Sequence, residues 1–295
     1  GRARVLLMEA GPSGRSLALG LPIGWISVAY GEAFNWGFRT TPEGEAHNRR
    51  VRWPRGRVLG GSTAINGMIY VRGQPRDFDE WADAGAEGWD WQSVAPFFER
   101  FENHSRARVA GQLQLQQAKP SLWGERFIAA CESAGIPRND SYLTGQSLGA
   151  GYYHQSVSRG WRQSAKVAFL NTASRRQNLK VVTGALIDRL TVDDGRITGV
   201  IWRDAQGRSA QVSAKHVILA AGAVGSPLIL QRTGIGDGAE LARLGIEPIL
   251  DRPAVGQNLQ DHFGTPVATE TEAAGTVWAD TQPSRLPAQL WRYLR

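Results

Sequence analysis

A glycine-rich segment near residue 60 has the residue types that a cofactor-binding loop requires. Gly60 and Gly61 are followed by the hydroxyl side chain of Ser62, and Asn66 comes one helical turn later. Glycines allow backbone N–H groups to approach a phosphate closely, and the hydroxyl and carboxamide add further donors and acceptors. The spacing fits a site for an anion or a heterocycle. It fits a plain glycine turn before an ordinary buried helix equally well.

Glu9 is a second candidate for cofactor binding. It follows the apolar run Val5–Met8, which predicts a buried parallel strand with an acid at its carboxyl end. Dinucleotide-binding folds place the acid that binds a ribose at this point, about twenty residues after a glycine-rich turn. That first strand and its turn have no counterpart before Val5. An acid after a strand is common, so Glu9 alone is weak evidence.

Two further glycine patterns point to chemistry that their context does not support. Gly145–Gly149 matches the nucleophile elbow of serine hydrolases, with Ser147 as the nucleophile. The elbow needs a strand before it and a helix after it, whereas loop-like residues surround Ser147, so a hydrolase is a distant alternative. Gly234–Ala239 formally satisfies a dinucleotide fingerprint. It follows an expected helix rather than a strand, so we predict a turn between helices.

The histidines and the cysteine do not form a metal site. The five histidines have no metal-type spacing, and His262 is expected to be structural and near a cofactor. The single cysteine, Cys131, has Phe127 and Ile128 at helical spacing, which predicts a small buried core residue. We therefore expect neither a metal nor a disulfide framework.

Composition excludes several classes of protein. The 295 residues are 42% hydrophobic and 21% charged, which is typical of a globular chain of one or two domains. The net charge of +7 comes from scattered arginines rather than a basic stripe, so nucleic acid is not an expected partner. No apolar run is long enough to cross a bilayer, and we expect no signal peptide.

Helices are predicted in the first half of the chain. Phe78 and Trp81 share one face of a first helix, and Ser93 is predicted to cap a second that carries Phe97, Phe98 and Phe101. A third helix is expected from about Leu122 to Ala134, ending at Gly135.

The second half predicts a β-meander. Strands are expected at 179–183, 185–192, 197–202 and 210–214, with a strong turn at Asp193-Asp194-Gly195. Val217–Ala221 then predicts another buried parallel strand, which ends at Gly222. These elements would return the chain to an α/β layer and place the candidate residues at strand ends and loops.

Five segments resemble the glucose-methanol-choline (GMC) oxidoreductases and occur in the family's order. Residues 56–73 resemble the first family signature, and residues 222–230 with 233–236 resemble the second. Residues 5–11, 160–164 and 255–262 also fit, and the branch resembled is the choline-dehydrogenase-like one. Five agreements in order along most of the chain are unlike a chance match.

The resemblance implies FAD as the cofactor and assigns its contacts to Glu9, Val58, Gly60, Gly61, Ser62, Asn66, Gly67, Met68, Ile187, Ala221 and Gly222. Glu9 would hold the adenosine ribose, and the backbone of Ile187 would meet the adenine. Residues 58–62 would line the pyrophosphate and the approach to the flavin, and residues 66–68 would lie beside the isoalloxazine. Ala221 and Gly222 would end the strand behind the cofactor. Ile65 stands where some members carry a histidine bonded to the flavin, so non-covalent FAD is expected.

The implied reaction is oxidation of an alcohol to a carbonyl compound, with hydride transfer to the flavin. Choline is one candidate among many primary alcohols, and the electron acceptor stays open. The family's catalytic histidine belongs to a segment after residue 262 that nothing in this chain resembles, so no catalytic residue is assigned. We therefore expect an incomplete, inactive fragment. A non-catalytic flavin-binding remnant is the alternative.

The expected fold is mixed α/β: a Rossmann-like FAD-binding domain with a β-meander, plus part of a substrate-binding domain. The FAD-binding domain would comprise 1–102 and 159–262, interrupted by a substrate-domain insertion at 103–158. Residues 263–295 would begin the truncated substrate domain. The expected location is the cytoplasm, with peripheral membrane attachment as the alternative.

Overall fold

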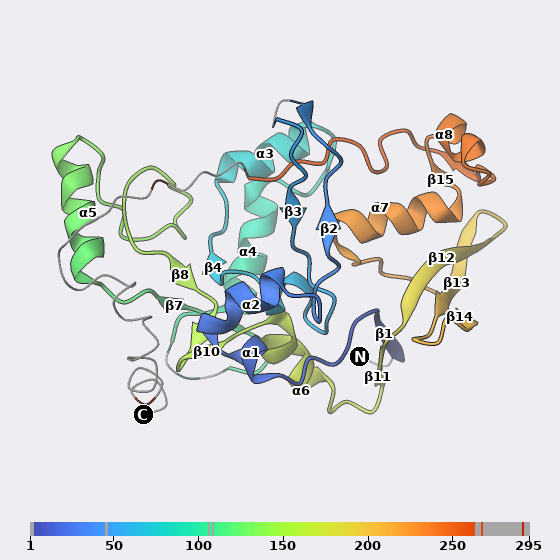
Figure 1. Cartoon of the computed structure of the whole chain (residues 1–295), viewed down its shortest axis with the longest axis horizontal. Helices are drawn as coiled ribbons and strands as arrows, with labels where there is room; N and C mark the ends of the chain where they lie inside the picture. The colour runs from blue at the N-terminus through green and yellow to red at the C-terminus, as the bar shows by residue number, and fades with distance from the viewer. Residues whose placement is uncertain are drawn as a thin grey trace. The chain divides into compact units, whose positions relative to one another are not determined.

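The computed structural model describes residues 3–44, 47–105, 107, 109–262, 267 and 291. The chain forms two compact units (Figure 1). Unit 1 comprises Gly1–Ser13 and Lys180–Thr269, and unit 2 comprises Gly14–Leu179 and Glu270–Arg295. The predicted start of a substrate domain at 263–295 lies almost wholly outside the described residues, and the predicted domain boundaries remain predictions.

The predicted β-meander is present in unit 1. Strands β12 (Leu186–Asp193), β13 (Arg196–Arg203) and β14 (Ser209–Ser213) pair antiparallel in that order. Asp194 (φ 47°) and Gly195 (φ 69°) both have left-handed backbone, as a two-residue hairpin requires. Leu190 and Val200 from the sheet pack with Ile229 of helix α7 (Gly222–Thr233), which forms the core of this unit.

Two predicted buried strands differ from expectation. Strand β1 (Val5–Glu9) exists and pairs with β11 (Leu179–Thr183), but Val5 is 50% and Leu6 38% exposed. Val217–Ala221 is not a strand, and Ile218 is 92% exposed. An extended apolar segment becomes a buried strand only when neighbours satisfy its backbone and cover its faces. In the described part of the chain, β1 has one neighbour and Val217–Ala221 has none.

The chain after α7 confirms a predicted turn. Gly234 ends the helix with φ 96°, and β15 (Ile235–Gly236) leads into helix α8 (Gly238–Arg243). β15 pairs in parallel with β16 (Leu250–Asp251). Gly234–Ala239 therefore connects helices and is not a phosphate-binding loop after a strand.

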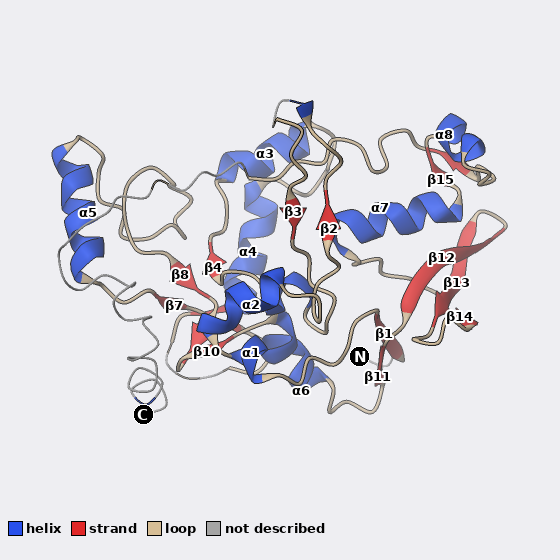
Figure 2. Cartoon of the chain, viewed as in Figure 1, coloured by secondary structure: helices blue, strands red, loops and turns tan. Residues whose placement is uncertain are grey.

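The three predicted helices are present in unit 2 (Figure 2). They are α3 (Pro75–Asp83), α4 (Trp91–Phe101) and α5 (Leu122–Ser133). Phe78 lies 5.3 Å from Trp81 and 5.8 Å from Phe98, measured between ring centroids, so α3 and α4 share an aromatic cluster.

Two details of these helices correct the sequence prediction. Asp90, not Ser93, caps α4, because its carboxylate accepts the backbone N–H of Ser93. An N-cap aspartate accepts the free amide three residues after it, here that of Ser93. Cys131 is only partly buried, since α5 places Ile128 inside and leaves Phe127 67% exposed.

The rest of unit 2 consists of short elements: α1 (Leu17–Gly20), α2 (Trp25–Tyr30), β2 (Phe38–Arg39), β3 (Arg52–Trp53), β4 (Ile69–Tyr70), β5 (Glu102–Asn103), β6 (Leu113–Gln114), β7 (Gln116–Gln117), β8 (His154–Gln155), β9 (Val157–Ser158), β10 (Trp161–Arg162), a π-helix at Lys166–Leu170 and α6 (Asn171–Ala173). Leu19 and Val28 pack against Val58, Ala64 and Ile65, so a hydrophobic core lies directly under the glycine-rich segment. None of the described helices is both long enough and apolar enough to span a bilayer.

Candidate functional site

The glycine-rich segment forms a tight loop rather than the start of a long helix. Only Gly61–Ala64 is helical, as a 3₁₀ turn that follows Gly60 with φ 99°. Asn66 Oδ1 then accepts the backbone N–H of Met68 at 3.1 Å, and Met68 has φ 64°. A side chain that takes a nearby amide and a left-handed residue both stop a helix from continuing. The segment is therefore an open loop on the Val58–Ile65 core.

The glycines of this loop are of two kinds: some have open space beside them, and others lie in close contact with neighbouring backbone. A Cβ at Gly61 or at Gly67 would meet no heavy atom within 4 Å. A Cβ at Gly56 would lie 2.7 Å from the backbone nitrogen of Ser62 and closer still to the carbonyl of Gly61. Gly56 also donates its N–H to Ser62 Oγ at 3.0 Å. The loop is thus tightly packed at Gly56 and also at Gly60, where a Cβ would lie 3.3 Å from Lys166, and it is open at Gly61 and Gly67, as an approaching cofactor would require.

Arg162 of β10 fixes the other end of the loop, and its role is not apparent from the sequence. It is 2% exposed, and its Nη1 donates to Asn66 O at 2.7 Å and to Asn66 Oδ1 at 2.9 Å. Nη1 also lies 3.3 Å from the carbonyl oxygen of Thr63. Because Asn66 Oδ1 accepts from both Arg162 and Met68, the Asn66 side-chain NH₂ remains available to donate outward. The motif at 160–164 therefore orients a residue of the first signature.

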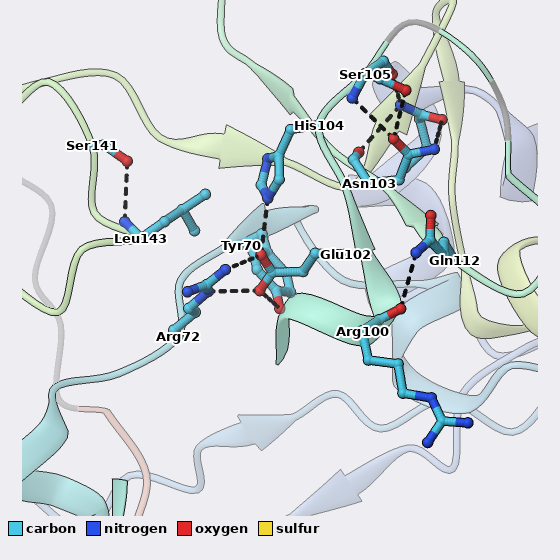
Figure 3. A network of polar contacts seen from close by, with 11 residues as sticks. Tyr70, Arg72, Arg100, Glu102, Asn103, His104, Ser105, Gln112, Ser141 and Leu143 are labelled. Atoms are coloured by element: carbon cyan, nitrogen blue, oxygen red, sulfur yellow. Dashed lines mark hydrogen bonds and ion pairs between the residues drawn. The ribbon is translucent and has the colours of Figure 1, made fainter. Parts of the chain in front are cut away.

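The strand after the loop is held by a buried carboxylate. Met68 O accepts the backbone N–H of Ser156 at 2.9 Å, and β4 pairs with β8. Figure 3 shows Tyr70, Arg72 and His104 converging on Glu102. The Tyr70 hydroxyl donates to Glu102 Oε1 at 2.7 Å, and Arg72 forms a bidentate ion pair at 2.8 and 2.5 Å. Glu102 thereby ties β4 to β5.

Burial and hydrogen bonding act in opposite directions on this carboxylate. Burial raises the pKa of Glu102, but the hydrogen bonds from Arg72, Tyr70 and His104 outweigh it, so the net pKa is lowered. Burial raises the pKa of Tyr70, and Glu102 raises it further. Glu102 is therefore an anion and Tyr70 a neutral donor at neutral pH. His154 has a lowered pKa through burial and the neighbouring His104.

In unit 1 the predicted site residues lie at strand ends and at an irregularity of the meander. Glu9 ends β1, and its Oε1 accepts the backbone N–H of Gly11 at 2.7 Å. Its carbonyl accepts the N–H of Ala185 at 2.9 Å, which brings Glu9 close to the start of β12. Ile187 pairs with Trp202, and a bulge follows it at Asp188. Bulges re-aim backbone groups and are frequent beside functional sites.

Asp188 is a second residue whose role the sequence did not indicate. Its side chain is 6% exposed and accepts from Arg189 at 2.8 Å and Arg203 at 3.2 Å. Arg232 of α7 also pairs with it. Leu190 N–H donates to Thr233 Oγ1 at 2.9 Å, so α7 is attached to β12 by polar contacts as well as apolar ones. These contacts hold the strand that carries Ile187.

Ala221 and Gly222 begin α7 instead of ending a strand. Ala221 donates its N–H to Ser226 Oγ at 3.0 Å. Gly222 has φ 82°, and a Cβ there would meet no heavy atom within 4 Å. The predicted cofactor residues thus form two sets. Val58, Gly60, Gly61, Ser62, Asn66, Gly67 and Met68 share one loop of unit 2, and Glu9, Ile187, Ala221 and Gly222 belong to unit 1.

The rival sites do not have the required geometry. Ser147 Oγ accepts from Gln74 Nε2 at 2.6 Å, and neither a strand nor a helix borders it. Residues that the structure describes include no cluster of three metal-ligating side chains. His262 is exposed, and its N–H donates to Asp261 Oδ1, so its predicted place near the cofactor remains untested.

Comparison with known sequences gives one family. Residues 7–264 match the family model described as GMC oxidoreductase. The chain is 37% identical over 271 residues to the oxygen-dependent choline dehydrogenase of Vibrio vulnificus, covering 88% of this chain and 48% of that protein. It is 36% identical to the enzyme of the same name from Brucella anthropi, covering 95% and 52%. The chain therefore spans about half the length of these curated relatives.

Comparison with solved structures also finds flavin-dependent oxidoreductases. Pyridoxine 4-oxidase from "Mesorbium loti" matches with a TM-score of 0.79 and 32% identity, over 85% of this chain and 51% of that one. An FAD-dependent oxidoreductase from Chaetomium thermophilum matches with a TM-score of 0.78 and 28% identity, over 88% and 48%. The predicted mixed α/β class with a Rossmann-like FAD-binding domain is thus confirmed. With the family model matching residues 7–264, the chain belongs to the GMC oxidoreductase family.

Proposed function

We propose that this chain supplies the FAD site of an enzyme that oxidises an alcohol to a carbonyl compound. The observation that carries the proposal is the Gly56–Met68 loop. Its backbone is held by the close contact and hydrogen bond between Gly56 and the Gly61–Ser62 backbone and side chain, while Gly61 and Gly67 have open space beside them. Residues fixed before binding lose little freedom when a ligand arrives, which favours tight binding.

The residues of the loop fit a planar heterocycle with a pyrophosphate. Gly60, Gly61 and Ser62 offer close backbone approach, and the Asn66 NH₂ is directed by the contacts of Asn66 Oδ1 with Met68 and Arg162. Ile65 is 2% exposed and has no nucleophilic atom, which supports non-covalent FAD. In unit 1, Glu9 is proposed for the ribose and the Ile187 backbone for the adenine. Ala221 and Gly222 are proposed to lie behind the cofactor.

When bound, FAD supplies the acceptor for the hydride that leaves the alcohol carbon. The residues of this chain bind and orient it. The hydroxyl proton passes to a general base, which the family resemblance assigns to a histidine. Loss of the hydride to FAD and of the hydroxyl proton to the base converts the alcohol into a carbonyl compound.

The substrate is proposed as a small primary alcohol, with choline first because the sequence relatives are named choline dehydrogenases. Dioxygen is the first electron acceptor to examine, since those relatives are named oxygen-dependent. The cytoplasm remains the expected location on sequence grounds.

The test is the visible absorption spectrum of the purified protein, followed by identification of any cofactor released on denaturation. We expect a flavin spectrum and free FAD. Gly56→Ala should lower the bound FAD at least about tenfold, because the new Cβ displaces the loop backbone. Gly44→Ala is the matched control, since a Cβ there meets nothing within 4 Å. A colourless folded protein that does not take up added FAD would contradict the proposal.

A catalytic enzyme and a non-catalytic flavin-binding protein differ in a second measurement. Anaerobic choline or another primary alcohol bleaches the flavin absorbance of an enzyme, and air restores it. A flavin that no alcohol bleaches, in a preparation that includes the family's C-terminal half, would favour the non-catalytic alternative.

A further inference from the structure

Arg162 is an unusual cation in this fold. It is 2% exposed, and arginine is among the residues least often buried without a partner. Its Nη1 contacts only neutral acceptors, namely the carbonyl oxygens of Thr63 and Asn66 and the Asn66 carboxamide oxygen. Arg162 Nε and Nη2 are buried and have no hydrogen-bond partner among the described residues.

Two other arginines, for example, contact buried carboxylates. Arg72 has Glu102 at 2.5 Å, and Arg189 has Asp188 at 2.8 Å. Arg162 forms no ion pair within the part of the chain that the structure describes, which leaves a buried positive charge without a carboxylate beside it. Burial lowers its pKa to about 10, so the guanidinium still carries its charge at neutral pH.

An uncompensated buried charge destabilises a fold, so its presence needs an offsetting benefit. Within this chain the charge adjoins Thr63 and Asn66, residues of the loop proposed to face the flavin. Hydride uptake adds one negative charge to the isoalloxazine. A nearby positive charge in a low-dielectric site favours that reduced state over the neutral oxidised one.

We propose that Arg162 is a positioning residue that raises the reduction potential of the bound flavin through its unpaired charge. The inference rests on the proposed FAD site. It assigns Arg162 two roles: orienting Asn66 through Nη1 and setting the electrostatic potential at the cofactor.

The experiment measures the midpoint potential of the FAD-loaded protein by dye-coupled titration in four forms: parent, Arg162→Met, Arg162→Lys and Arg159→Met. Arg162→Met removes the charge and should reduce the equilibrium constant for reduction about tenfold, which is about 30 mV for a two-electron couple. Arg159→Met is the matched control, because Arg159 is exposed and lies three residues away. It should leave the potential unchanged.

Arg162→Lys separates charge from orientation and covers the case in which Arg162→Met does not fold. A buried lysine has a depressed pKa and loses its charge as the pH rises. The potential of Arg162→Lys should therefore match the parent at low pH and fall below it as the pH increases. A lysine variant that releases its proton within the titrated pH range and still keeps the potential of the parent would overturn the inference.

Other outcomes separate this inference from the function on which it rests. FAD bound by Arg162→Met with the potential of the parent contradicts the electrostatic role and leaves the FAD site intact. A parent protein that takes up no FAD overturns both. An equal fall for Arg162→Met and Arg159→Met would indicate net charge at long range rather than the buried guanidinium.

Discussion

Asn66 illustrates what a single residue gains from its neighbours. The family resemblance assigned it a contact to the cofactor, but not the direction of its carboxamide. Arg162 Nη1 and the Met68 N–H both donate to Oδ1, which fixes the amide so that the NH₂ group is the one left to donate. Arg162 is almost a hundred positions later in sequence, so no local pattern could reveal this contact. The role of Asn66 at the cofactor stays a prediction, and its orientation could not be predicted from local sequence.

His154 leads to a prediction for acid stability. Burial lowers its pKa below the ordinary 6.5, and His104 lowers it further while Glu102 opposes both. Tyr70 and Arg72 are the other charged or titratable groups of this cluster. A lowered histidine pKa means that the unfolded chain binds more protons, so stability is present above pH 6.5 and falls as the pH drops through that value.

The measurement is the urea midpoint at pH 7.5 and pH 5.5. The parent should lose stability between these values, and His154→Asn should lose less because it removes a group that resists protonation. His216→Asn is the control, since it makes the same substitution at an exposed histidine. Identical pH dependence in His154→Asn and the parent would show that another group is responsible.

At the scale of elements, Glu102 attaches β4, the strand after the glycine-rich loop, to β5 through its contacts with Tyr70 and Arg72. The Glu102 side chain is 1% exposed and that of Arg72 is 15% exposed. Removing one partner of a buried ion pair leaves the other charge without compensation, which costs several kcal/mol, whereas exposed pairs contribute little.

Glu102→Gln should therefore destabilise the protein by about 3 kcal/mol in urea unfolding at pH 7. Glu80→Gln breaks the Arg76–Glu80 pair, whose side chains are 84% and 59% exposed, and should cost less than about 0.5 kcal/mol. The two variants thus compare a buried arginine–carboxylate pair, Arg72–Glu102, with an exposed one, Arg76–Glu80. Equal losses in the two variants would mean that Glu102 is not the anchor of β4.

The longer elements of the fold were predictable from local pattern, and the failures have two causes. The meander and three helices follow from periodicity and turn residues, as at Asp194-Gly195. Val217–Ala221 has the composition of a buried strand, yet strand formation depends on a neighbour that local sequence does not specify. The predicted cap of α4 was Ser93 and the observed cap is Asp90. Both residue types can cap a helix, and only the local geometry decides between them.

At the scale of the whole molecule, cofactor binding should control stability. A ligand that binds only the folded state adds about 2.7 kcal/mol at a free concentration one hundred times its dissociation constant. For a chain of this size that corresponds to roughly 5 °C or more in the unfolding temperature. Removing FAD by dialysis should lower the unfolding temperature by this amount, and adding FAD back should restore it.

NAD serves as the control ligand for this measurement, because it shares the adenosine and pyrophosphate but lacks the isoalloxazine. It should produce a much smaller shift. An unfolding temperature that does not respond to FAD, or responds equally to NAD, would be inconsistent with a flavin-specific site.

The extended segment Val217–Ala221 has a consequence for the chain during its synthesis. A short, uncharged run without proline, with Ile218 92% exposed, is the kind of sequence that other extended chains can join edge to edge. As the nascent polypeptide leaves the ribosome, this run would be a natural binding segment for chaperones. How much of the chain escapes such edge-to-edge contacts, rather than the final packing of the core, would then decide how much of the protein reaches its native state.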